Sequence, residues 1–135
     1  MLSKPNKTSR RILVADDDPV MMRVVTRILA EAGYQIIAAN DGREAYRILQ
    51  TDADFQAAIF DLKMPHLQGI DIVRYMRTEK RLMRIPVVMM SADQNLTVQG
   101  ESFAAGATAF LLKPFTSGNV QTILRLLGGR EVIAA

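Results

Sequence analysis

The chain has 135 residues, a length that fits one domain. Hydrophobic residues make up 49% of it and charged residues 23%, as in globular proteins, which excludes a disordered or collagen-like chain. It contains no cysteine, which excludes disulfides, thiol catalysis and cysteine-bound zinc. The lack of cysteine also leads us to expect a reducing, cytoplasmic location. No apolar run approaches the roughly 18 residues of a membrane span, so we expect no membrane partner.

The net charge of +3 and the pI of about 9.5, taken alone, suggest a nucleic-acid-binding protein. The distribution of charge argues against this, because four of the 17 basic residues lie within the first eleven positions, which contain no acid. Without those four, the rest of the chain carries 13 basic against 14 acidic residues. We therefore expect residues 1–10 to form a flexible basic tail, and no direct contact with nucleic acid. A second basic group is interpreted as a solvated helix face and comprises Arg74, Arg77, Lys80, Arg81 and Arg84.

The first predicted elements are an apolar strand at residues 12–15 and a helix in which apolar residues recur every three or four positions from Val20 to Ala32. Asp18 suits the N-cap of this helix, Pro19 its first turn and Gly33 its end. The local sequence therefore predicts one β/α unit with both ends of its helix marked.

The pattern then repeats along the chain, with further apolar runs at 36–39, 57–60, 86–90 and 110–112. Each is followed by a helical stretch, and these stretches begin near Gly42, Gly69, Asn95 and Thr116 or Ser117. Gly100 weakens the fourth helix. Continuous apolar runs are typical of strands buried on both faces of a parallel sheet. We expect an α/β fold with an open, doubly wound, five-stranded parallel sheet and five helices, in one domain at 11–128 with a C-terminal tail at 129–135.

Polar residues follow the apolar runs, at the sheet edge where ligands bind in open α/β folds. They are Asp16 and Asp17, Asn40 and Asp41, Asp61, Ser91, and Lys113. Several carboxylates gathered at one edge repel unless a cation joins them, and Mg²⁺ suits such oxygen ligands. One carboxylate beside the metal can act as a nucleophile toward phosphorus and form an aspartyl phosphate. Each residue also has a simpler interpretation, since Asp16–Asp18 alone suits a helix start, Asp61 alone suits a turn, and His66 suits a solvent-facing loop.

Four motifs, in this order, resemble the CheY-like receiver domain of bacterial two-component response regulators. They are ILVADDDP at 12–19, FDLKMP at 60–65 with Gly69 four residues on, VVMMSA at 87–92, and a stretch from Gly106-Ala107 to FLLKPF at 110–115. The resemblance covers residues 11 to about 127. It implies a flavodoxin-like sheet with strand order 2-1-3-4-5.

The resemblance also implies roles for individual residues. Asp61 would be the phosphoacceptor, and Mg²⁺ would be held by Asp16, Asp17, Asp61 and the backbone carbonyl of Lys63. Lys113 would bind the phosphoryl group and precede a cis peptide bond to Pro114. Ser91 and Phe110 would be the switch residues.

By this resemblance the protein is a signalling switch and not an enzyme. It would receive the phosphoryl group from a histidine kinase or a histidine phosphotransfer protein. The face made by the fourth helix, fifth strand and fifth helix would then change and bind a downstream protein effector, or the phosphoryl group would pass along a phosphorelay. We expect a bacterial, cytoplasmic protein, a monomer or weak dimer, that is either a stand-alone receiver or the excised receiver of a longer regulator.

A further expectation concerns the surroundings of Asp61. Lys63 and Asp93 flank the route of an attacking water, and an ion pair between them would shield the phosphoryl group and slow its hydrolysis.

The main rival function is an enzyme of the haloacid-dehalogenase type, which also uses an aspartate nucleophile and Mg²⁺. Such enzymes need a second aspartate two residues after the nucleophile, where this chain has Lys63. A nucleotide-binding protein is disfavoured because the sequence contains neither of the glycine-rich phosphate-binding motifs, G-x-G-x-x-G and G-x-x-x-x-G-K-[ST].

Overall fold

The computed structural model describes residues 10–128, and a five-stranded parallel sheet lies at its centre. The strands, in chain order, are β1 (Arg11–Ala15), β2 (Gln35–Ala39), β3 (Ala57–Asp61), β4 (Val87–Ser91) and β5 (Ala109–Leu112). Their order across the sheet is β2-β1-β3-β4-β5, with every neighbouring pair parallel. The α/β fold, the doubly wound sheet and the strand order 2-1-3-4-5 are therefore confirmed.

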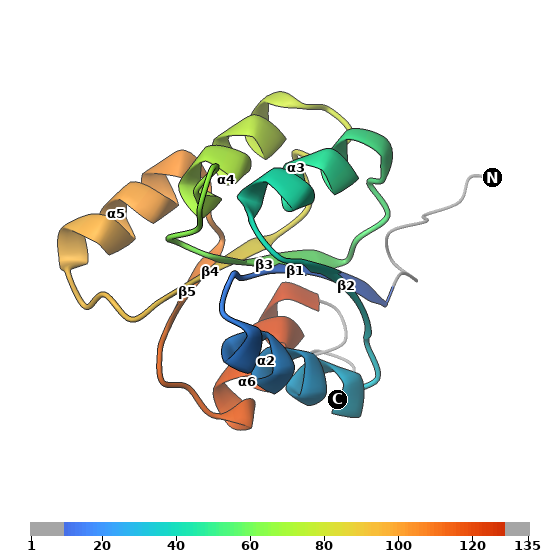
Figure 1. The fold of residues 1–135 in the computed structure, drawn as a ribbon, viewed down its shortest axis with the longest axis vertical. Coiled ribbons are helices and arrows are strands. Elements are labelled where there is room, and N and C mark those ends of the chain that lie inside the picture. Colours follow the sequence, from blue (N-terminus) through green and yellow to red (C-terminus); the bar gives the residue numbers. More distant parts are fainter. Residues whose placement is uncertain (1–9, 129–135) are drawn as a thin grey trace.

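Five helices alternate with the strands and cover both faces of the sheet. They are α2 (Pro19–Glu31), α3 (Gly42–Thr51), α4 (Gly69–Thr78), α5 (Leu96–Ala105) and α6 (Ser117–Gly128). Helices α3, α4 and α5 lie on one face, and α2 and α6 lie on the other (Figure 1). This arrangement places the loops that follow the strands together at one edge, which is where the predicted site residues belong.

Each face of the sheet has its own hydrophobic core, and the central strands contribute to both. On β3, Phe60 packs under α3–α5 while its neighbour Ile59 packs under α2 and α6. Both side chains are at most 1% exposed. This two-sided burial explains why the central strands read as continuous apolar runs.

The helix ends follow the local sequence. Asp18 accepts a hydrogen bond from the Val20 amide, and Asp41 accepts one from the Glu44 amide. Gly33 adopts the left-handed conformation just after α2, at φ +94°. Helix α5 is the least anchored, because Ser102 is its one buried side chain while Leu96 and Phe103 are exposed.

Two expectations about basic residues need correction. The charge distribution in the sequence assigns Arg11 to the basic tail, but Arg11 lies in β1, donates to both carboxylate oxygens of Asp52 and packs over the Phe55 ring. Arg77 was assigned to a solvated helix face. It is in fact half-buried and donates to the carbonyls of Gly106, Met83 and Ile85 at 2.9–3.1 Å.

Of the predicted tails, residues 1–9 and 129–135 lie outside the described residues. Arg10, the last residue assigned to the basic tail, packs over the Tyr34 ring and donates to the Ala32 carbonyl. Among residues 10–128, no helix is both long and apolar enough to cross a membrane.

Candidate functional site

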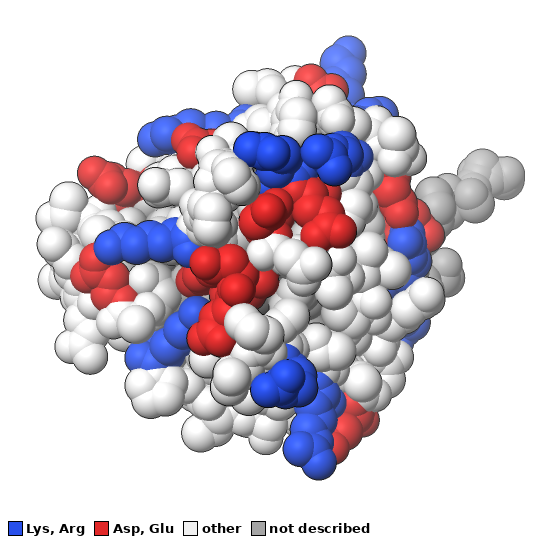
Figure 2. All heavy atoms as spheres, viewed as in Figure 1, with Lys and Arg blue, Asp and Glu red and all other residues white. Residues whose placement is uncertain are grey.

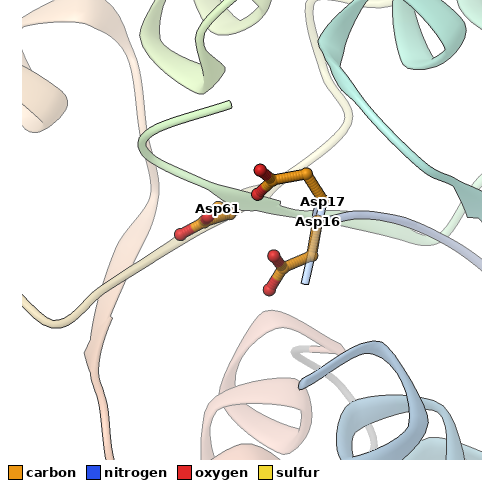
Figure 3. Close-up of side chains that lie close together, drawn as sticks. All are labelled: Asp16, Asp17 and Asp61. Carbon is orange, nitrogen blue, oxygen red and sulfur yellow. The ribbon is translucent and has the colours of Figure 1, made fainter. Parts of the chain in front are cut away.

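Three aspartates meet at the carboxyl edge of the sheet. Asp61 is the last residue of β3, and Asp16 and Asp17 directly follow β1, the neighbouring strand. Each offers a carboxylate oxygen, and these oxygens all lie within 4.8 Å of one another. Figure 3 shows the three carboxyl groups turned to the same side of the sheet edge. The structure thus brings together the three carboxylates that the sequence placed at neighbouring strand ends.

Lys113 supplies the positive charge at this cluster. It follows β5, and its Nζ lies 3.3 Å from Asp61 Oδ1 and 3.4 Å from Asp16 Oδ2. Its backbone amide donates to the Ser91 carbonyl, which extends the β4–β5 pairing to the site. The peptide bond from Lys113 to Pro114 is cis, as expected.

The three carboxylates differ in their surroundings. Asp16 is buried, and both of its oxygens have partners, the Asp18 amide on Oδ1 and Lys113 on Oδ2. Asp17 is exposed, and Asp61 is intermediate. The site is therefore open to solvent on the side of Asp17 and Asp61 and closed beneath Asp16.

The charge at this edge is not balanced by the protein alone. Burial raises the pKa of Asp61 to about 6, and the negative charge of Asp16 adds to the effect while Lys113 opposes it. Three carboxylates face one ammonium group here, and acidic side chains gather near the middle of this face in Figure 2. An oxygen-rich site with excess negative charge suits a hard divalent cation such as Mg²⁺, so the donor set fits that ion.

Ser91 and Phe110 lie on the same face of two neighbouring strands. Ser91 ends β4 and pairs with Leu112, whereas Phe110 pairs with Met89, two residues before Ser91. Side chains two apart on a strand share a face, and Met89 and Phe110 both belong to the core under α3–α5. Ser91 is buried at 5% exposure, and its Oγ accepts a hydrogen bond from the Asp93 amide. The partly buried Phe110 thus lies diagonally across from Ser91, on the side of α5.

Asp41 and the pair of Lys63 with Asp93 differ from what the sequence predicts. Asp41 does not join the aspartate cluster but caps α3, because its carboxylate accepts from the Glu44 amide. The expected ion pair of Lys63 with Asp93 is wrong for this structure: no ion pair between described residues joins them. Asp93 accepts instead from the Asn95 amide. The predicted shielding of the phosphoryl group therefore loses its physical basis.

The contacts of two arginines, one near the site and one at the end of α5, were not predicted from the sequence. Arg43 contacts His66 in the loop after β3, and Arg77 binds the carbonyl at the end of α5. Arg77 follows the apolar residue Val73 by four positions, so its helical spacing was a signal that it faces inward. Nothing local in the sequence marks the contact between Arg43 and His66, which are 23 residues apart.

Comparisons with known proteins agree with this geometry. The response regulator receiver domain family matches residues 12–125. Chemotaxis protein CheY1 of Helicobacter pylori is 32% identical over 107 residues, which cover 78% of this chain and 86% of that protein. The structure of chemotaxis response regulator CheY4 of Vibrio cholerae superposes with a TM-score of 0.82 at 30% identity, covering 89% of this chain and 99% of that one.

A further solved structure bears on the metal. It is the receiver domain of a sensor histidine kinase from Pseudomonas aeruginosa, with a magnesium ion coordinated in its active-site cleft. This structure superposes with a TM-score of 0.83 at 27% identity, and the match covers 90% of this chain and 99% of that chain.

The match to the family and the identity to CheY1 show that the chain belongs to the response regulator receiver domain family. It is a CheY-like receiver of two-component signalling, a class of signalling switches rather than classical enzymes.

Proposed function

We propose that the chain is a phosphorylation-controlled switch in which Asp61 accepts a phosphoryl group from a phosphohistidine of a histidine kinase or phosphotransfer protein. The observation that carries this proposal is the position of Asp61 between two further carboxylates and Lys113 at the carboxyl edge of a receiver fold. Asp61 is the candidate nucleophile because it is less buried than Asp16, whose two oxygens both have protein partners.

In the transfer, a carboxylate oxygen of Asp61 forms a bond to phosphorus while the bond from phosphorus to the histidine nitrogen breaks. The electron pair of the broken bond stays on the leaving imidazole, which takes up a proton. Lys113 Nζ, 3.3 Å from Asp61 Oδ1, places a positive charge beside the entering phosphoryl oxygens. Asp16, Asp17, Asp61 and the Lys63 carbonyl would hold Mg²⁺, which when bound neutralises charge and orients the phosphoryl group.

The phosphorylated state would be sensed through Ser91 and Phe110. A phosphoryl group adds about 1.5 to 2 negative charges and strong acceptor oxygens, which can draw the Ser91 hydroxyl away from the Asp93 amide. The space released on that face of the sheet can be taken by Phe110. The weak anchoring of α5 favours this path, since a phosphoryl group can only shift an equilibrium between states that are already close in free energy.

The experiment that tests the switch compares backbone amide NMR spectra of the protein with Mg²⁺ before and after addition of acetyl phosphate. We expect large shifts for the amides of β5, α5 and the start of α6, and none of them in Asp61→Asn. The Ser91→Ala variant should accept the phosphoryl group but show smaller shifts in α5. Shifts confined to the immediate neighbours of Asp61 would contradict the switch while leaving phosphorylation itself intact.

A further inference from the structure

The beginning of α3 packs against the loop that joins β3 to α4, residues 62–68. A Cβ atom added to Gly42 would overlap the carbonyl oxygen of Leu67, so only glycine allows this approach of helix backbone to loop backbone. Gly42 is buried, and α3 begins there with Asp41 as its cap. The loop that follows Asp61 is therefore in direct contact with the first turn of a helix from a neighbouring unit.

The next residue of α3 binds the same loop through its side chain. Arg43 Nη2 lies 2.9 Å from Nδ1 of His66. A guanidinium group can only donate hydrogen bonds, so Nδ1 of the imidazole must be the acceptor. In this contact His66 is therefore neutral and carries its proton on Nε2.

His66 has an unusual backbone conformation that this contact helps to hold. Its φ of +71° is the one positive φ of a non-glycine residue among residues 10–128. A residue with a side chain adopts this region at a cost of about 1 kcal/mol, and the conformation persists where the surroundings favour it. Since His66 is exposed, burial does not fix it, and the hydrogen bond from Arg43 restrains its side chain.

Backbone hydrogen bonds hold both ends of the loop. The Leu62 amide donates to the Met90 carbonyl at 2.8 Å, and the Gly69 amide donates to the Leu62 carbonyl at 3.1 Å. Leu62 and Met64 are both 6% exposed, and their side chains belong to the core under α3–α5. His66 and Leu67, further along the loop, contact α3.

We propose that Arg43 is a positioning residue for the metal site: through His66 it holds the loop 62–68 so that the Lys63 carbonyl stays in place as a ligand. This inference rests on the proposed function, in which that carbonyl binds Mg²⁺. Loss of the Arg43 contact lets the loop sample other conformations, so part of the binding free energy of Mg²⁺ is spent on ordering it.

The test measures the dissociation constant of Mg²⁺ by isothermal titration calorimetry on the full chain. For Arg43→Ala and for His66→Gly we expect binding about two- to fivefold weaker, the range for one exposed hydrogen bond. Glycine suits the positive φ, so His66→Gly removes the acceptor without backbone strain. His66→Asn should bind Mg²⁺ like the parent, because asparagine tolerates this conformation and its Oδ1 can accept where Nδ1 did.

Arg47→Ala is the matched control, since Arg47 is an exposed arginine one turn further along α3. Removing a cation near the site should by itself strengthen Mg²⁺ binding, so weaker binding by Arg43→Ala cannot come from the charge change. The double variant Arg43→Ala, His66→Gly should be no weaker than either single variant, because both remove the same contact.

The outcomes separate this inference from the proposed function. If the parent binds Mg²⁺ and Arg43→Ala binds it equally well or more tightly, the positioning role is overturned and the metal site stands. If His66→Asn binds as weakly as His66→Gly, the hydrogen bond is not the cause. If the parent binds no Mg²⁺, both proposals fail. Nitrogen NMR of the parent adds a check that needs no variant: a His66 ring protonated on Nδ1 would also overturn the inference.

Discussion

Replacement of Asp61 by asparagine should make the protein more stable in the absence of metal. The raised pKa of Asp61, about 6 instead of 3.8, means that the folded protein binds this proton more tightly than the unfolded chain. The folded state therefore loses stability as the pH rises from about 4 to about 6, and it stays less stable above that range. The asparagine side chain has no charge to bury beside Asp16, so Asp61→Asn avoids the loss.

The size of the effect follows from the pKa. A rise of about two units corresponds to at most about 3 kcal/mol, and contact of the carboxylate with solvent reduces this to about 1 kcal/mol. For a domain of this length we expect an increase in Tm of about 3–5 °C at pH 7.5 with EDTA present. At pH 5 part of this difference should remain, because the unfolded chain is already ionised there; below about pH 4 Asp61 is protonated in both states, so the difference should shrink toward zero.

Thermal unfolding followed by circular dichroism measures the Tm of the parent and of Asp61→Asn at each pH. Asp93→Asn is the control, since it makes the same chemical change near the site, and its amide oxygen can still accept from Asn95. Added Mg²⁺ should reverse the order by raising the Tm of the parent but not that of Asp61→Asn. The reasoning is refuted if Asp61→Asn melts at or below the temperature of the parent at pH 7.5, or if the same gain persists below about pH 4.

Three other predictions concern the anchoring of α5. Arg77→Ala removes three hydrogen bonds to backbone carbonyls and should lower the free energy of unfolding by about 2–3 kcal/mol in urea titrations; a loss below about 0.5 kcal/mol would contradict the role of Arg77. Gly106→Ala should cost at least about 2 kcal/mol, because φ is +119° and the new Cβ would lie 2.6 Å from Arg77 Cγ. Gly100→Ala, at an exposed helical position with open space around it, should instead stabilise the protein by about 0.5–1 kcal/mol, and a loss of stability there would show that α5 needs this glycine for packing.

The sheet and the aspartate cluster could be predicted because both depend on local sequence and on chain topology. Continuous apolar runs mark strands buried on two faces, and the predicted helix cap Asp18 marks where α2 begins. Once the strands are parallel, their carboxyl ends share one edge, so Asp16 and Asp61 must approach each other. No side-chain detail is needed for that step.

The contacts that were missed depend on long side chains reaching across the fold. Arg77 spans 29 residues to the Gly106 carbonyl, and Arg43 spans 23 residues to His66. The spacing of such residues along a helix shows which way they face but not which carbonyl or ring they reach. The ion pair expected between Lys63 and Asp93 fails for a related reason. Both residues flank the site in the sequence, but the carboxylate of Asp93 accepts a hydrogen bond from the Asn95 amide of its own loop.

The most direct test of the central claim is the mass of the intact protein after incubation with Mg²⁺ and acetyl phosphate. A phosphoryl group adds roughly 80 Da, so we predict one such adduct on the parent protein, formed only when Mg²⁺ is present. The adduct should be absent from Asp61→Asn and should form on Asp93→Asn. An adduct that persists in Asp61→Asn, or a folded parent protein that forms none, would contradict the assignment of Asp61 as the phosphoacceptor.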